Sequence, residues 1–440
     1  MRFLVLFLGM FSLLWWPPWE GRADDGTLLG SLDLNTAIEH ALQNNLDLKA
    51  KRQTLGIAQG RVQQADLLLQ NNPELSVDVA WRNRRFIAPT GRSVTDVKVG
   101  LLQEFEIAGQ RGHRREAATK NLTQTEWSVI DAERLLRLEV TQAFYNLLAL
   151  QEKIAVQREV LATQEILLEL GQERFDRKDL SILDLDTLRS DRDRVQSDLV
   201  DRESERLLAK KQLLLLLGLS EERSLVTGGN LLDLSRAQLG GDKVPHSPEE
   251  LEKCALENRP DLKAAQIAVE VRGAELRLAQ AGRIPNVALG PFYAYDDENQ
   301  VVGGSLSVPL PFFNRNQEER ATTLANLEIS RIELQARRRA VAQEVASSFA
   351  RMRLAERRLA SYGETYTDHI NQSVALTRKA YQAGEISVIA VSVTQDRLAQ
   401  GRFRYLDAAL AYLQATADLE AQAFCTGKAE SGTEEQVPPQ

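Results

Sequence analysis

Four short stretches of the chain alternate apolar with polar or small residues, which indicates β-strands that have one apolar face. In the first stretch, Leu75, Val77, Val79 and Trp81 occupy every second position. The alternation predicts strands, paired as two hairpins, over residues 74–84, 94–106, 286–295 and 301–311. Each strand has about ten residues, the length that a tilted strand needs to cross a membrane. A soluble hairpin with one buried face would show the same alternation.

After each hairpin the apolar positions recur every three or four residues, which indicates helices. Leu136, Val140, Phe144 and Leu147 have this spacing in a stretch without proline. The pattern predicts long helices over residues 110–171, 181–217, 316–383 and 387–424. The first of these would be roughly 90 Å long at about 1.5 Å per residue.

Shorter helices are predicted before the two hairpins, over residues 33–70 and 248–282. The second of these has clear start signals, with Ser247 as N-cap, Pro248 at the first helical position and Glu250 as the returning side chain of a capping box. Ser181 and Asp184 form a similar pattern at the start of a long helix.

The chain also contains an internal duplication. Residues 41–50, Ala-Leu-Gln-Asn-Asn-Leu-Asp-Leu-Lys-Ala, recur at 255–264 as Ala-Leu-Glu-Asn-Arg-Pro-Asp-Leu-Lys-Ala, with seven of ten positions identical. Each copy is followed by a helix, a hairpin and a long helical pair, a unit too long for a solenoid repeat. The predicted divisions are a first repeat at 24–218, an irregular equatorial segment at 219–246, a second repeat at 247–425 and a disordered tail at 426–440.

The first 23 residues are predicted to be an export signal that is removed from the mature protein. Arg2 supplies a positive start, residues 3–16 an apolar core, and Gly21 and Ala23 the small residues of a cleavage site. A transmembrane anchor is the alternative, but the apolar core is shorter than the roughly 20 residues that a spanning helix needs.

Charge and cysteine usage narrow the class of protein further. The net charge of −8 argues against a nucleic-acid partner. Cys254 and Cys425 lie far apart in helical contexts, so we expect two buried or unpaired thiols and not a disulfide framework.

The sequence offers no candidate for a cofactor, a metal centre or a catalytic site. His40, His113, His246 and His369 are scattered, and Met352 is the only methionine beyond the predicted signal. The cysteine and histidine spacing of a zinc site is missing. We therefore expect a protein that is not an enzyme.

Four membrane strands cannot close a sheet. Open edges would leave backbone groups unpaired in lipid, and known single-chain bacterial barrels have at least about eight strands. The sequence therefore predicts that several copies pool their strands, to about 12 from three copies or about 16 from four. The long helices would continue this barrel as a water-filled tube, which favours a conduit over an enzyme.

Over residues 30–425 the layout resembles the TolC-like outer-membrane efflux proteins. The passages at 103–111 (Gln-Glu-Phe-Glu-Ile-Ala-Gly-Gln-Arg) and 308–316 (Val-Pro-Leu-Pro-Phe-Phe-Asn-Arg-Asn) resemble the heavy-metal branch of this family, the cobalt-zinc-cadmium type. The resemblance implies a homotrimer with a 12-stranded outer-membrane barrel and an α-helical periplasmic barrel. It also implies a periplasmic adaptor (membrane fusion protein) and an inner-membrane RND pump as partners.

The same resemblance places the turns between the long helices at a periplasmic mouth that is shut at rest. The family's inward aspartates after the second turn correspond to Ala390 and Val393 here, so acidic residues elsewhere are the candidates for the constriction. The gate candidates are Arg174, Phe175, Asp176, Asp179, Asp184, Asp186, Arg378, Tyr381 and Glu385. Candidate contacts with the adaptor are Leu180, Gly384, Ile386 and Ser387. A solvated, charged turn without a gating role is the alternative.

Two further groups are candidates for the membrane interface. Trp81, Tyr293 and Tyr295 would form an aromatic girdle near the ends of the strands. Arg111, Arg114 and Arg115 follow the second strand and could bind lipid phosphates, although a solvated helix start would look the same.

We therefore expect the outer-membrane duct of a tripartite efflux system, with a long periplasmic extension, that passively carries heavy-metal cations out of a Gram-negative-type cell. The alternatives are a duct for type I protein secretion or for multidrug export, and a periplasmic adaptor. An adaptor would have one helical hairpin flanked by β-rich modules, and not a duplicated chain with two alternating hairpins.

Overall fold

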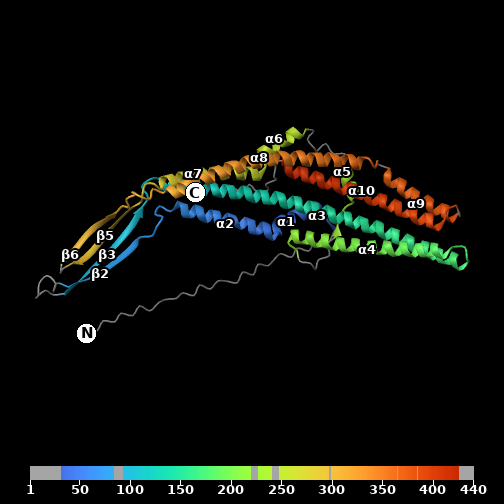
Figure 1. Cartoon of the computed structure of the whole chain (residues 1–440), viewed down its shortest axis with the longest axis horizontal. Coiled ribbons are helices and arrows are strands. Elements are labelled where there is room, and N and C mark those ends of the chain that lie inside the picture. The colour runs from blue at the N-terminus through green and yellow to red at the C-terminus, as the bar shows by residue number, and fades with distance from the viewer. Residues whose placement is uncertain are drawn as a thin grey trace, which may run out of the picture.

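The computed structural model describes residues 31–83, 93–219, 226–239, 247–296, 299–363, 365–383 and 385–425. It is an elongated, mainly helical molecule with a small sheet at one end (Figure 1). The predictions of a signal peptide, of a disordered tail and of a role for Gly384 fall outside the described residues.

The sheet consists of β2 (Glu74–Asn83), β3 (Ser93–Phe105), β5 (Val287–Asp296) and β6 (Asn299–Ser307). All neighbours are antiparallel, in the order β2-β3-β5-β6, so the two hairpins lie side by side. β6 ends four residues before the predicted boundary at 311. Proline has no N–H to donate to a ladder, and Pro309 and Pro311 follow the last paired residues.

From the sheet the chain enters α3 (Gln110–Asp176), a single helix about 100 Å long at about 1.5 Å per residue. It returns along α4 (Ile182–Leu217). The predicted cap of α4 is confirmed, because Ser181 Oγ accepts a hydrogen bond from the Asp184 N–H at 3.0 Å.

The predictions of single helices at 33–70 and 248–282 were wrong, since each region contains two helices. The first contains α1 (Leu34–Asn44) and α2 (Leu46–Asp66), and the second contains α6 (Pro248–Asn258) and α7 (Pro260–Ala281). Both breaks lie at one extended residue, Asn45 or Arg259, each with ψ 127°. Asn45 caps α2 by accepting from the Leu48 N–H, and Arg259 precedes a proline, which disfavours helical backbone there.

The predicted helix at 316–383 is also divided, into α8 (Gln317–Ala360) and α9 (Tyr366–Gln382); α10 (Val388–Ala423) follows. Gly363 has a φ of +68° between α8 and α9, a conformation that favours glycine. The Tyr362, Tyr366 and Tyr405 rings form a cluster at this break, with centroids 4.9–5.4 Å apart.

The segment expected to be irregular, 219–246, contains a short strand, β4 (Val226–Thr227), and a helix, α5 (Leu231–Leu239). β4 pairs in parallel with β1 (Ser31–Leu32), at the start of the described chain. The Glu152 carboxylate of α3 accepts a hydrogen bond from the Leu231 N–H, so α5 is tied to the long helix.

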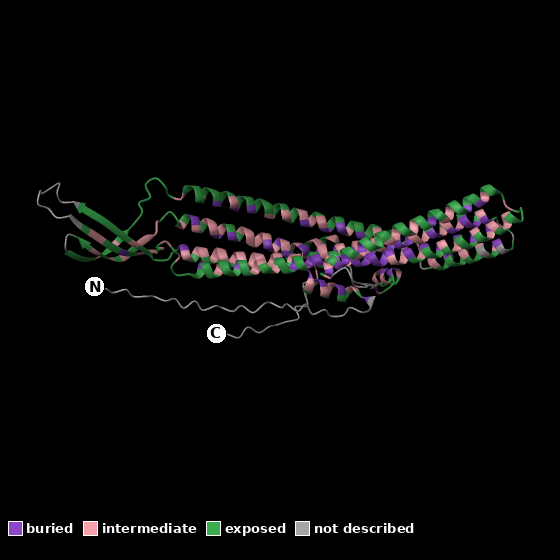
Figure 2. Ribbon diagram, turned by 90° about the horizontal axis from the view of Figure 1, so that it is seen from below, coloured by how far each residue is buried: buried purple, intermediate pink, exposed green. Residues whose placement is uncertain are grey.

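The main core lies in the middle of the molecule and not at the sheet (Figure 2). Phe144 and Leu148 of α3 pack there with Leu213 of α4 and Leu413 of α10. Away from it, the helices are half-buried or exposed along much of their length. Not one of the described helices is both long enough and apolar enough to traverse a lipid bilayer.

The expectation of two unpaired thiols was wrong, because Cys254 and Cys425 form a disulfide. Their Cα atoms lie 5.3 Å apart although the residues are separated by 171 positions. Leu251 and Ala255 of α6 share the main core with Ala423, so the packing of α6 on the end of α10 brings the two thiols together.

Arg259 is the largest fully buried side chain and stabilises the same junction. It pairs with Asp261 at 2.8 Å and with Glu344 of α8 at 2.7 Å. Arg337 donates to the same Asp261 carboxylate at 2.7 Å. Burial alone would raise the pKa of Asp261, but the hydrogen bonds and charges of the two arginines outweigh it and hold this pKa below its ordinary value.

Replacement of this buried arginine should be costly. We expect Arg259→Met to lower the free energy of unfolding by about 3 kcal/mol, because Asp261 would remain buried with Arg337 as its one cationic partner among the described residues, beside the Leu262 N–H. Thermal unfolding of the detergent-solubilised protein, followed by circular dichroism, measures the change. Arg331→Met is the matched control, since Arg331 forms an exposed pair with Glu328 on its own helix, and such pairs contribute at most about 1 kcal/mol. Equal melting temperatures for the two variants would contradict the stabilising role of the buried Arg259.

Because the folded-state pKa of Asp261 is lowered, its contribution is present at neutral pH, above the unfolded value of about 3.9. It is lost as the pH falls through the folded-state pKa. The difference in the free energy of unfolding between the wild type and Arg259→Met should therefore become smaller only in strong acid.

Candidate functional site: an amphipathic sheet and a helical tip

One face of the sheet is apolar across all four strands. The register aligns Val77 of β2 with Val99, Val99 with Tyr293 of β5, and Tyr293 with Val302 of β6, so these side chains share a face. They are exposed within the chain, Val302 to 80%. We call this the apolar face; it consists of Leu75, Val77, Val79, Trp81, Val97, Val99, Leu101, Phe105, Val287, Leu289, Pro291, Tyr293, Tyr295, Val302 and Leu306.

The opposite face carries charges and small residues. Arg82 pairs with Asp96 at 3.0 Å and with Asp296 at 2.6 Å, which links strands of both hairpins. The Lys98 ammonium lies 4.7 Å from the centre of the Phe292 ring. A Cβ on Gly303 would come within 2.7 Å of that ring, so glycine is needed there.

The sheet has two open edges. β2 and β6 are the terminal strands of the order, and among the described residues neither pairs with a further strand on its outer side. A sheet with one apolar face, one polar face and two free edges is incomplete as a membrane element, because every backbone group must be paired in lipid.

Trp81, Tyr293 and Tyr295, the predicted aromatic girdle, all lie on the apolar face and are 68%, 43% and 37% exposed. Tyr295 and Trp81 lie toward the ends of the strands that carry the hairpin turns. Their contact with lipid headgroups stays a prediction.

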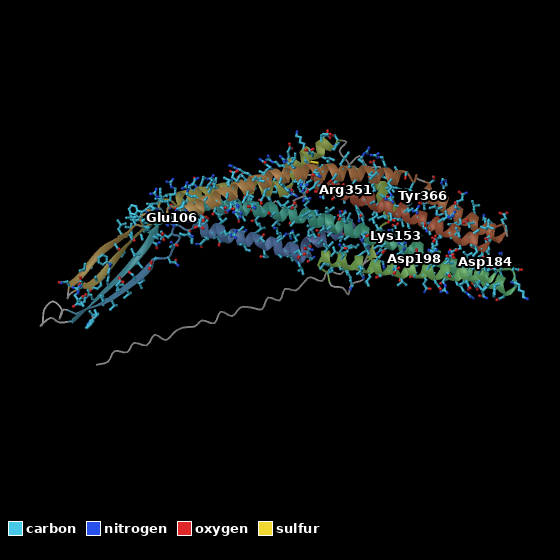
Figure 3. All side chains as sticks on the ribbon, viewed as in Figure 1. Glu106, Lys153, Asp184, Asp198, Arg351 and Tyr366 are labelled. Carbon is cyan, nitrogen blue, oxygen red and sulfur yellow. A yellow bond between two sulfur atoms is a disulfide. The ribbon has the colours of Figure 1, made fainter. Side chains whose placement is uncertain are left out.

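The three arginines predicted to bind lipid phosphates are engaged within the chain. Arg114 pairs with Glu106 at 2.5 Å, where the sheet joins the helices (Figure 3). Arg115 pairs with Asp66, and Arg111 donates to the Asp66 carbonyl at 2.8 Å. These contacts fasten the start of α3 to the end of α2 and to the strand before it, a structural role that the spacing of basic residues does not reveal.

At the opposite end of the molecule, the turn between α3 and α4 lies near the turn between α9 and α10 (Figure 1). We call this end the tip. A small core joins the two turns, with partly buried Leu180 and Ile386 packed against it. Its buried members are Leu167, Leu188, Tyr381, Val388 and Val391.

The gate candidates at the tip make local contacts. The Arg174 guanidinium lies 4.9 Å from the centre of the Tyr381 ring, so it stacks on an aromatic face and forms no ion pair among the described residues. Asp184 (Figure 3) accepts from the Ser181 hydroxyl, and Asp186 pairs with Arg189 of its own helix.

The remaining candidates lie at the surface of the tip. Asp176 accepts a hydrogen bond from Gln172 of the preceding turn. Asp179 and Glu385 are exposed, whereas Phe175 is half-buried. The side chain of Arg378 falls outside the described residues. The carboxylates therefore gather at one end of the molecule, and no ion pair among the described residues joins one of them to Arg174.

Sequence reasoning missed the polar contacts that hold the two helical pairs together behind the tip. Ser392 of α10 donates to the Asp191 carboxylate of α4 at 2.7 Å and accepts from Gln164 of α3 at 3.0 Å. Arg194 of α4 pairs with Asp396 of α10 at 3.1 Å. The partners lie about 200 positions apart in different repeats, and no local spacing marks them.

A metal centre is not part of this arrangement as far as the chain is described, since no three histidine, cysteine or acidic side chains cluster there in ligand geometry.

The fold and the sequence define the class of protein. The model of the family described as outer membrane efflux protein matches residues 37–219 and 251–423. These segments cover most of the chain, which therefore belongs to the outer membrane efflux protein family.

The chain is also similar to individual outer-membrane and cation-efflux proteins. The chain is 22% identical over 420 residues to the cobalt-zinc-cadmium resistance protein CzcC of Cupriavidus metallidurans, covering 92% of this chain and 96% of CzcC. It is 22% identical over 391 residues to the cation efflux system protein CusC of Escherichia coli, covering 85% of this chain and 82% of CusC. A crystal structure of CusC shares the fold with a TM-score of 0.71 at 20% identity, covering 89% of this chain and 91% of that chain.

The hydroxyl of Ser392 offers a test of how the tip is held. Ser392→Ala would leave the buried Gln164 amide and Asp191 without this partner, at a cost of about 1–3 kcal/mol. Amide hydrogen exchange near residues 182–194 and 388–396 should therefore accelerate by about tenfold.

Thr394→Ala is the control, because the Thr394 hydroxyl bonds to the Ala390 carbonyl of its own helix. Exchange rates that are the same in wild type and both variants would contradict a role of Ser392 in joining the helical pairs.

Proposed function

We propose that this protein is the homotrimeric outer-membrane duct of a tripartite efflux system, and that it carries heavy-metal cations passively to the exterior. The observation that carries the proposal is the sheet, which has one largely apolar face, a charged opposite face and two edges that pair with no further strand of the described chain. Family membership supports the class.

Closure of the sheet sets the number of copies. β2 and β6 are the edge strands of the described sheet. They point in opposite directions, because each neighbouring pair in the order β2-β3-β5-β6 is antiparallel, so β6 of one copy can pair antiparallel with β2 of the next. Three copies give a 12-stranded barrel with the apolar face toward lipid and Arg82, Asp96 and Lys98 toward the lumen. The helices continue this barrel into the periplasm.

The cation substrate rests on the relatives and on charge. CzcC is named for cobalt-zinc-cadmium resistance and CusC for cation efflux, and both align over more than four-fifths of this chain. The carboxylates at the tip would raise the local concentration of cations at the entrance. A wide aqueous duct needs no metal ligands of its own, so the RND pump would select the cargo.

The tip would meet the periplasmic adaptor. Leu180 and Ile386 are partly buried in the tip core, Ser387 caps α10, and Ile182 and Leu183 are exposed beside them. Apolar side chains at the end of a helical pair suit contact with the helical end of an adaptor. This contact would pull the two turns apart and open the mouth.

Two adjacent residues of β2 test the membrane assignment. Val79 lies on the apolar face and Ala80 on the opposite face, and both are exposed within the chain. Arginine on a lipid-facing strand costs roughly 2–4 kcal/mol at mid-membrane, whereas a lumenal arginine meets water. Val79→Arg should therefore sharply reduce the trimer recovered from outer membranes, while Ala80→Arg is recovered at the wild-type level. Equal recovery of both variants would contradict a lipid-facing apolar face.

The charged tip has its own test, measured as the cation-to-anion permeability ratio of trimers in planar bilayers. Asp184→Asn removes the carboxylate charge but keeps the backbone N–H that donates to the Ser181 cap, and Glu385→Gln removes the charge at the second turn. Each should lower the ratio several-fold, because a homotrimer loses three charges and a unit charge about 10 Å from the path contributes about 0.4 kcal/mol in water.

Asp233→Asn on α5, an exposed charge far from the tip, is the control. A wild-type ratio in both tip variants would exclude these carboxylates as the constriction.

A further inference from the structure

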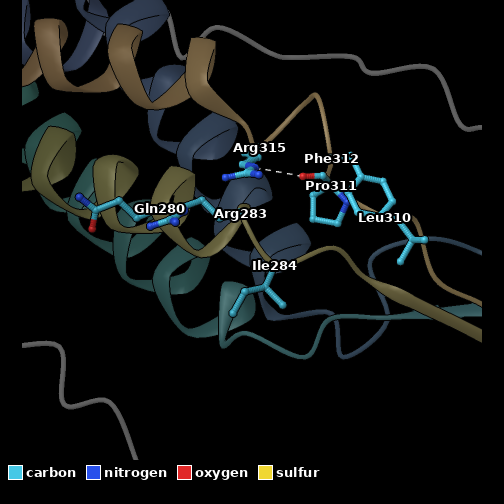
Figure 4. A pocket seen from close by; sticks show the side chains of 7 residues that line it. All are labelled: Gln280, Arg283, Ile284, Leu310, Pro311, Phe312 and Arg315. Atoms are coloured by element: carbon cyan, nitrogen blue, oxygen red, sulfur yellow. Dashed lines mark hydrogen bonds between the residues drawn. The ribbon is translucent and has the colours of Figure 1, made fainter.

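An open cavity of about 570 Å³ lies where the sheet joins the helices, between the end of α7 and the segment after β6 (Figure 4). Its lining residues are Gln280, Arg283, Ile284, Leu310, Pro311, Phe312 and Arg315. The lining thus combines four apolar side chains and two guanidinium groups with one amide and no carboxylate.

The apolar part of the cavity continues the apolar face of the sheet. Leu306 is the last apolar-face residue of β6, and Leu310 and Phe312 follow it in the chain. Both are about two-thirds exposed, and the adjacent Phe313 is 94% exposed. Exposed aromatic side chains at the end of a membrane strand are typical of the interface between acyl chains and headgroups.

The basic part of the cavity has unused capacity for an anion. Arg283 forms no ion pair with any described residue. Among the described residues, the Arg315 guanidinium donates only to the Pro311 carbonyl, at 3.2 Å, and to no carboxylate. In Figure 4 the Arg283 and Arg315 side chains lie on the helical side of the cavity, and Leu310, Pro311 and Phe312 lie on the side toward the sheet. In contrast, Arg111 and Arg114 are held by groups of the chain itself.

We propose that this cavity binds a phospholipid of the periplasmic leaflet, with the headgroup phosphate on Arg283 and Arg315 and an acyl chain along Leu306, Leu310 and Phe312. The inference rests on the proposed function, which puts the apolar face in the membrane. Guanidinium groups bind phosphate oxygens with charge-assisted hydrogen bonds, and basic residues at the membrane surface attract anionic lipids. The bound lipid would fix the position, relative to the membrane surface, of the junction between the sheet and the helices.

A second copy of the chain is the competing occupant. Closure of the sheet would bring the segment before β2, where Leu68 is 74% exposed, near the segment after β6 of the neighbouring copy. Residues 67–73 contain three leucines but no acidic residue, and Glu74 at the start of β2 adds one carboxylate, so this segment could cover the apolar wall but could not neutralise both arginines. The charge of the cavity therefore favours a phospholipid.

The test is native mass spectrometry of the detergent-purified trimer after incubation with phosphatidylglycerol. We expect the wild type to retain phosphatidylglycerol and Arg283→Gln/Arg315→Gln to retain about a hundredfold less, since each of the two lost charged hydrogen bonds weakens binding about tenfold, or by about 1.4 kcal/mol. Arg331→Gln, an exposed arginine of α8 away from the cavity, should retain the wild-type amount. Undiminished retention in the double variant would overturn the proposal.

Two further arms identify the occupant. Excess inorganic phosphate should not displace the bound lipid, because phosphate lacks the acyl chain. If the trimer binds phosphate but retains no lipid, the proposal that the occupant is a phospholipid is wrong. Leu68→Cys with Phe312→Cys should give little cross-linked product, and efficient cross-linking between copies would mean that the neighbour covers the cavity. If the wild-type trimer is intact but retains no lipid, only the proposal for this cavity is wrong. If no trimer of the wild type can be isolated from outer membranes, the proposed function itself is wrong.

Discussion

The interaction on which the rest of the molecule depends is backbone hydrogen bonding along the four-stranded sheet. Among the described residues, β3 and β5 have a hydrogen-bonded neighbour strand on both sides, but β2 and β6 have none on their outer sides. In water these groups could bond to solvent, but the exposed apolar face makes water the wrong surroundings for the sheet. Lipid suits the apolar face and forbids the open edges. Assembly with further copies is the solution that satisfies both demands, which is why the proposed duct is an oligomer.

The passage from sheet to helices is built from polar contacts, and these explain one of the two passages that resemble the metal-efflux branch. Glu104 accepts from Asn286 at 2.9 Å, Gln110 donates to Asn286 at 3.1 Å, and Glu106 binds Arg114. These residues come from both repeats, so the junction also joins the two halves of the chain. The other passage, after β6, instead leaves its aromatic and basic side chains exposed.

Periodicity was enough to predict the elements, because strands and long helices are set by which face of each is apolar. It was not enough to predict their interruptions. Asn45 and Arg259 each end a helix by the conformation of one residue, and Gly363 divides α8 from α9 inside a continuous helical pattern. Contacts between repeats were out of reach for a different reason. Cys254 meets Cys425 and Asp191 meets Ser392 only because the halves pack together, and no spacing in the sequence records that packing.

The distribution of buried side chains separates the stable part of the molecule from the part that can move. The main core, the disulfide and the Arg259 network all lie in the middle and hold α6, α8 and α10 together. The tip has its own small core, and a third cluster around Val160, Val195 and Ala399 lies between the two. Local opening is least costly where few apolar contacts are lost. Separation of the turns at the tip would therefore disturb Tyr381 and its few neighbours while the middle stays folded, so a change at the mouth need not reach the sheet.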